Sequence, residues 1–96
     1  MTATITEAEF ARIVNGIVED RDSIIKHNPI GTEEEILLWM LLAVLSSYLN
    51  LADKEMPCFT GKPDAKTYRA AIEFVVKGRM DGVFDIEKFL AMMAVE

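Results

Sequence analysis

The sequence predicts an all-α protein: a compact domain of four helices arranged around an apolar central helix. Residues 36–52 include only three clearly polar side chains, so this segment needs cover on every side. Signals for a helix start recur at four places, and no segment alternates as a β-strand does. With 96 residues and 51% hydrophobic content, the chain is long enough for one core, so residues 1–96 are expected to form a single domain.

The first helix is expected to start after Thr6 and to end at Asn28. Thr6 with Glu9 forms a capping box, in which each side chain satisfies a backbone N–H of the other residue. The residue before a proline resists the helical conformation, which stops the helix at Asn28. Arg21 interrupts the apolar stripe of this helix, which consists of Phe10, Ile13, Val14, Ile17, Ile24 and Ile25.

The second helix, at about residues 33–53, is the apolar one. Thr32 and Glu35 form a second capping box, and the three glutamates of the first turn complement the helix dipole. Its apolar part, residues 36–52, would extend roughly 26 Å, less than the ~30 Å core of a bilayer. No basic cluster flanks it. The segment is therefore interpreted as a buried helix and not as a membrane span.

Two shorter helices complete the predicted fold, after a loop of roughly ten residues that contains three turn-forming residues, Pro57, Gly61 and Pro63. Asp64 is the expected cap of the third helix and Gly78 its stop. Asp85 is the expected cap of the fourth. The apolar residues of these two helices are Tyr68, Ala71, Ile72, Val75 and Val76, with Phe74 widening the apolar face of the third helix, and Ile86, Phe89, Leu90 and Met93 in the fourth.

The charge excludes several classes of partner. The net charge is −6, and residues 1–55 hold ten acids against four bases. Binding to a phosphate backbone depends on Lys and Arg, so direct contact with nucleic acid is not expected. An anionic membrane surface is excluded for the same reason. A single cysteine and an N-terminus without a signal-peptide pattern favour a cytoplasmic protein.

No residue pattern indicates catalysis, a cofactor or a metal. His27 and Cys58 are the only histidine and cysteine, and their spacing does not predict a pair. Asp81-Gly82-Val83-Phe84-Asp85 resembles the middle of an EF-hand loop. However, three positions that should supply oxygen ligands carry Lys77, Arg79 and Lys88, which excludes calcium. The chain is therefore expected not to be an enzyme.

The candidate interface comprises soft or aromatic apolar side chains and one arginine: Trp39, Met40, Tyr48, Met92, Met93 and Arg21. A methionine-rich face either fills a core or receives a partner helix. Arg21 has two interpretations, a recognition charge at the interface or an arginine whose stem covers the core while its head meets a carboxylate. A homodimer mediated by helices would cover the surplus apolar surface that four helices leave.

Three functions remain open from the sequence. The first is a small, acidic, non-enzymatic protein-interaction module that associates with itself. The second is an acidic regulator or inhibitor that docks on a basic site of a larger protein, such as one that handles nucleic acid. The third is a small-ligand domain with a pocket between helices lined by Trp39, Phe10 or Phe74.

Overall fold

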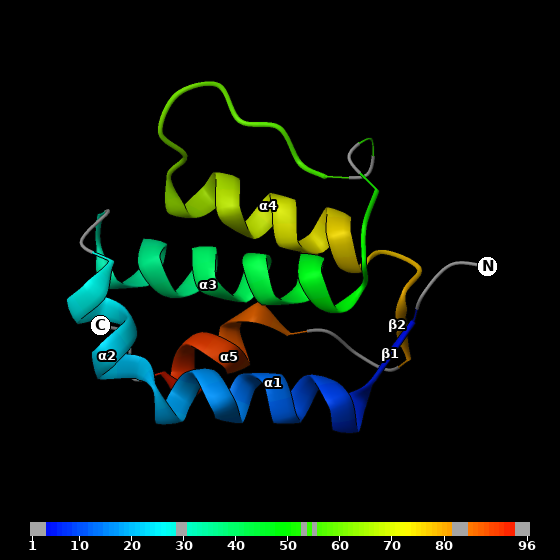
Figure 1. Ribbon diagram of the computed structural model, residues 1–96, viewed down its shortest axis with the longest axis horizontal. Coiled ribbons are helices and arrows are strands. Elements are labelled where there is room, and N and C mark those ends of the chain that lie inside the picture. The colour runs from blue at the N-terminus through cyan, green and yellow to red at the C-terminus, as the bar shows by residue number, and fades with distance from the viewer. Residues whose placement is uncertain (1–3, 29–30, 53, 55, 82–84, 94–96) are drawn as a thin grey trace.

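The computed structural model describes residues 4–28, 31–52, 54, 56–81 and 85–93. The described chain is mostly helical and folds into a compact globule of 37 × 31 × 20 Å. Its elements are β1 (Ile5–Thr6), α1 (Glu7–Glu19), α2 (Arg21–His27), α3 (Glu33–Tyr48), α4 (Ala65–Val76), β2 (Met80–Asp81) and α5 (Ile86–Met92) (Figure 1).

All four predicted N-caps are confirmed. The side chains of Thr6, Thr32, Asp64 and Asp85 each accept a hydrogen bond from the backbone N–H three residues later. The second capping box is complete, because the Glu35 carboxylate also accepts the backbone N–H of Thr32, at 3.0 Å. These bonds satisfy donors that a helix start otherwise leaves unpaired.

The predicted number of helices is wrong, because the first one is divided at Asp20. The backbone of Asp20 leaves the helical region, with φ −98° and ψ 8°, and a separate helix α2 follows. The interruption coincides with Arg21, the charged residue in the middle of the apolar stripe. The change of direction turns Arg21 toward polar partners while Ile17 stays buried and Ile24 half-buried against the core.

The second helix ends earlier than predicted and is not buried on every side. It ends at Tyr48, and Asn50 takes a left-handed conformation with φ 52°. Within it, Ala43 is exposed, and Trp39 and Met40 are only half-buried. Its remaining face supplies the centre of the core with Ile36, Leu37, Leu38, Leu41, Leu42 and Leu45.

A short parallel pair of strands, which the sequence did not predict, ties the N-terminal segment to the chain after α4. Ile5 pairs with Met80, and Thr6 pairs with Asp81. The Ile5 N–H donates to the carbonyl of Arg79 at 2.8 Å, and the Ile5 side chain is fully buried. Two residues per strand are too few to show the alternation by which strands are recognised.

The connection between α3 and α4, residues 49–64, determines the layout of the molecule, and we call it the crossover. Figure 1 shows that it returns along the whole length of α3, so that α4 runs parallel to α3 beside it. An up-and-down bundle with short loops would instead place successive helices antiparallel. None of the helices among the described residues has both the length and the apolar character needed to cross a membrane.

The cap of α4 makes the stability of the protein depend on pH. Hydrogen bonds from the hydroxyl and the backbone N–H of Thr67, at 2.7 and 2.8 Å, lower the pKa of Asp64. A lowered pKa in the folded state stabilises the fold above the ordinary aspartate pKa of about 3.9, and this contribution is lost as the pH falls through the folded-state pKa.

We therefore expect Asp64→Asn to lower the melting temperature at pH 7, because the amide keeps a cap but loses the charge. The difference from the unmodified protein should shrink steadily between pH 5 and pH 3. Melting curves of both proteins across this range test the prediction. A difference that does not change with pH would show that the carboxylate charge does not stabilise the helix start.

Candidate protein-binding surface

Exposed apolar side chains are concentrated in one part of the sequence. Among the described residues, five large hydrophobic side chains are exposed, and four of them lie between positions 48 and 74. These four are Tyr48 (45% exposed), Met56 (40%), Phe59 (39%) and Phe74 (58%). Together we call them the crossover surface, since they lie on the crossover itself and on the two helices that it joins.

Phe74 is exposed because of its position on α4. Residues four apart lie on the same side of a helix, and Lys66, Ala70 and Phe74 follow this spacing. Lys66 and Ala70 are also exposed, which identifies this side as the solvent side of α4. The side of α4 that faces the core is formed by Tyr68, Ala71, Ile72, Val75 and Val76.

The crossover is held on the helices by a few specific contacts. Phe59 packs edge-on against Tyr68, with ring centroids 5.7 Å apart and an interplanar angle of 64°. Leu51 is half-buried, and its N–H donates to the carbonyl of Ser46 at 3.3 Å. Burial, reinforced by the charge of Glu35, raises the pKa of Tyr68.

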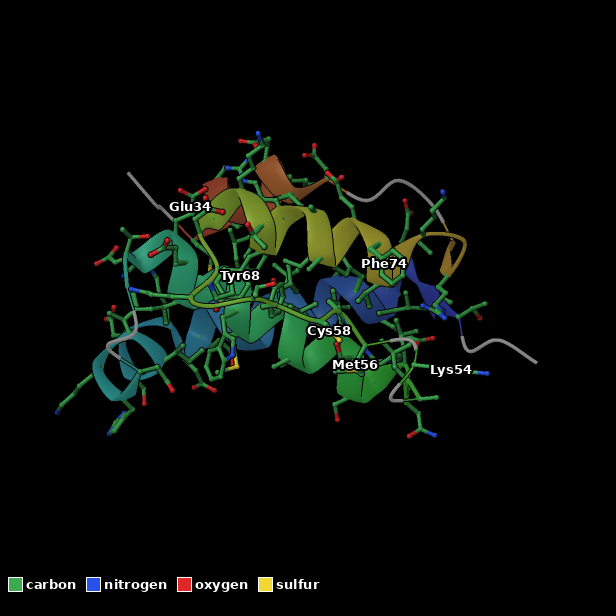
Figure 2. All side chains as sticks on the ribbon, turned by 90° about the horizontal axis from the view of Figure 1, so that it is seen from above. Glu34, Lys54, Met56, Cys58, Tyr68 and Phe74 are labelled. Carbon is green, nitrogen blue, oxygen red and sulfur yellow. The ribbon has the colours of Figure 1, made fainter. Side chains whose placement is uncertain are left out.

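Figure 2 views this side of the molecule from above. Met56 and Cys58 lie along the crossover where it passes over the helices, and Phe74 lies on the neighbouring part of α4. Cys58 is exposed, and its thiol has the Met56 carbonyl as a weak acceptor at 3.9 Å. The crossover therefore presents an exposed thiol beside the exposed side chain of Met56.

The six residues of the predicted interface do not form one surface. Tyr48 belongs to the crossover surface, whereas Trp39 and Met40 are half-buried against the core. Met92 is 45% exposed, but it lies on α5. Met93 has no exposed surface, because it belongs to the apolar core.

Arg21 binds groups within its own chain. Its Nε donates to the carbonyl of Met93 at 2.6 Å, and its Nη2 donates to Glu33 at 2.7 Å. A third contact, from Nη1 to Asp22, measures 3.1 Å, and the side chain is 24% exposed. This geometry matches the second interpretation of Arg21, an arginine whose stem covers the core while its head meets carboxylates.

A groove of about 410 Å³ lies between α1 and α5. Phe10, one of the three aromatic residues considered for a ligand pocket, lines it, whereas Trp39 and Phe74 do not. Its apolar lining is completed by Ala11, Val14, Met80, Phe89 and Met92, and its polar lining by Glu7, Asn15, Asp85 and Lys88.

A second hollow, of about 530 Å³, lies between α4 and α5 and is lined mostly by charged side chains. Arg69 is central to it and links three helices, because it donates to Glu34 of α3 at 2.7 Å and to Glu87 of α5. The bond to Glu34, together with the contact to Glu87, raises the pKa of Arg69. This arginine is engaged in holding the helices together.

Among the described residues, no group of three or more His, Cys, Asp or Glu side chains could hold a metal ion. His27 Nδ1 lies 2.8 Å from the Ser23 carbonyl, and Cys58 contacts Met56, so each has its own partner. Asp85 acts as the helix cap expected of it, while the rest of the EF-hand-like turn, residues 82–84, lies outside the described residues.

Sequence reasoning missed three of the four residues of the crossover surface. The assignment of Phe74 to the apolar face of the third helix is wrong, because its side chain is 58% exposed. Its spacing from Lys66 and Ala70 places it on the solvent side of a helix that otherwise has a clear apolar side. Met56 and Phe59 had no such signal. They lie in a loop, where no helical or strand period relates side-chain position to burial.

Comparison with known proteins gives no relative from which a function could be inferred. No family model, no curated protein and no solved structure matches the chain.

The contacts of Arg21 predict that it stabilises the fold. We expect Arg21→Ala to lower the free energy of unfolding by about 1–2 kcal/mol, since charge-assisted bonds to Met93 and Glu33 are lost. Asp22→Asn is the matched control, because the Asp22 side chain is 97% exposed. It should change the value by less than about 0.5 kcal/mol. Urea denaturation measures both, and an equally small effect of Arg21→Ala would contradict the structural role.

Proposed function

We propose that this chain is a non-enzymatic helical protein-interaction module, acidic overall, that associates with itself through the crossover surface. The observation that supports the proposal is that Tyr48, Met56, Phe59 and Phe74, four of the five large hydrophobic side chains that the described residues expose, lie on the crossover and on the two helices that it joins. Exposed apolar patches on monomeric proteins typically mark interaction sites. Aromatic residues and methionine are also enriched in protein interfaces.

Phe74 is the expected anchor of this contact. It is the most exposed of the four side chains, at 58%, so burial of its ring contributes little to the stability of the folded monomer. Large aromatic side chains contribute most of the binding energy at interfaces when a partner covers them. The exposed thiol of Cys58 is consistent with a reducing compartment, and we place the protein in the cytoplasm.

Sedimentation equilibrium over a range of protein concentrations tests the proposal. The average mass of the unmodified protein should rise with concentration, and Phe74→Gln should raise the dissociation constant at least tenfold. Glutamine has good helix propensity, so this substitution replaces the apolar ring with a polar amide without disfavouring the helix. Met92→Gln is the matched control, because Met92 is exposed at 45% on α5, outside the crossover surface.

The salt dependence of the association distinguishes this function from docking through the acidic residues. An apolar contact should persist at 0.5 M NaCl, because salt screens charge pairs but not apolar burial. A mass that stays at the monomer value at every concentration, or an association that Phe74→Gln leaves intact, would overturn the proposal.

A second candidate function, binding of a small apolar ligand, is favoured by the groove between α1 and α5. Its volume of about 410 Å³ lies within the range of small-molecule sites, and Phe10, Val14 and Phe89 line it. A ligand that binds only the folded state raises the melting temperature. A panel of apolar small molecules should therefore contain compounds that raise it, and Val14→Phe, which narrows the groove, should cancel the shift. Uniform melting temperatures across the panel would count against this function.

A further inference from the structure

The groove between α1 and α5 has an apolar body and one charged end. Its lining along α1 begins at Glu7, and Figure 1 shows that α5 runs in the same direction as α1. The charged residues that line it at the start of α5, Asp85 and Lys88, therefore belong to the same end of the groove as Glu7. Farther along the two helices the lining is apolar apart from Asn15, and consists of Phe10, Ala11, Val14, Phe89 and Met92.

The charged end of the groove is negative on balance. Glu7 and Asp85, both exposed, contribute two carboxylates, whereas Lys88 contributes one ammonium group. The net charge of −6 on the whole chain adds to the attraction of a cation. The helix dipoles oppose it, but the Thr6 hydroxyl and the Asp85 carboxylate already accept N–H groups at the two helix starts. This end of the groove therefore favours a cationic group over a carboxylate or a phosphate.

Two aromatic rings line the groove next to its charged end. Phe10 projects from α1 and is half-buried, and Phe89 belongs to α5. The face of an aromatic ring attracts a cation, and proteins use such rings to recognise organic ammonium ions. The same rings provide contact area for an apolar or aromatic part of a ligand. The groove thus combines carboxylates and aromatic rings, the two kinds of group that hold an organic cation.

The dimensions of the groove restrict the ligand to a small molecule. From Glu7 to Asn15, the two ends of the lining on α1, the helix advances by about 12 Å at 1.5 Å per residue. The volume is about 410 Å³. This length suits one aromatic ring joined to a chain of a few carbon atoms.

We propose that the groove between α1 and α5 binds a small organic cation, an apolar molecule of this length that carries one amine or quaternary ammonium group. The proposal rests on the second candidate function and names the chemical class of its ligand. The ammonium group lies near Glu7 and Asp85, and the apolar part packs between Phe10, Val14 and Phe89. This ligand complements both the apolar lining and the negative end of the groove.

Three probes with the same apolar part and different head groups test the proposal. Phenylbutylamine is a cation at pH 7, phenylbutanol is neutral, and phenylbutyrate is an anion. Titration of the full chain, followed by NMR, gives the dissociation constant of each. The amine should bind about threefold to fivefold more tightly than the alcohol, as expected of one partly exposed ion pair, and the acid should bind most weakly.

Substitutions identify the groove as the site. Glu7→Gln leaves Asp85 and Lys88, whose charges offset each other, so the affinity for the amine should fall to that for the alcohol. Glu19→Gln is the matched control, because it makes the same change at an exposed position of α1 outside the lining, and it should leave the preference unchanged. Val14→Phe, which narrows the groove, should weaken the binding of all three probes.

The outcomes separate the charge of the ligand from the existence of the site. Equal affinities for the three probes, or tightest binding of the acid, would overturn the cationic ligand and leave an apolar-ligand function standing. A preference for the amine that is unchanged in Glu7→Gln would overturn the placement of its charge in this groove. Failure of all three probes to bind would overturn this inference together with the second candidate function.

Discussion

The packing of the whole structure depends on the burial of the apolar side chains of α3. The segment from Ile36 to Leu45 contains no polar side chain, and it supplies the six most central aliphatic residues of the helix to the core. A helix of this kind is stable only when other elements cover most of its surface. In this chain α1, α2 and α4 pack on α3, and α5 adds Phe89 and Leu90 to the same core. The crossover follows from this need, because it returns the chain to the start of α3 and allows α4 to pack along its full length.

The three glutamates that open α3 each have a separate task. Their negative charge suits the start of a helix in every case. In addition, Glu33 accepts a bond from Arg21 of α2, Glu34 accepts one from Arg69 of α4, and Glu35 closes the capping box with Thr32. Isolated ion pairs at a surface stabilise a fold only weakly, by about 0–1 kcal/mol. In this structure the two ion pairs, Arg21–Glu33 and Arg69–Glu34, orient α2 and α4 relative to the first turn of α3.

Local features were the most predictable part of this fold. The four caps follow from nearest-neighbour chemistry, and the structure has them where the sequence predicts them. The apolar helix begins where it was predicted but ends earlier, at Tyr48. The division at Asp20 was not predictable, because a continuous helix and a bent one share almost the same apolar stripe. The parallel course of α4 depends on packing between distant segments. The surface around Phe74 was partly predictable from helical spacing, whereas Met56 and Phe59 acquire their positions only through the path of the crossover.

The pairing of Ile5 with Met80 has a consequence for how the molecule forms. The helices and their caps depend on neighbours in sequence and can form early, but this pair joins positions separated by most of the chain. The entropic cost of closing a long loop is met only once the intervening helices are in place, so the pair belongs among the last contacts to form. The N-terminal segment thus pairs with the chain after α4 once the core around α3 has assembled.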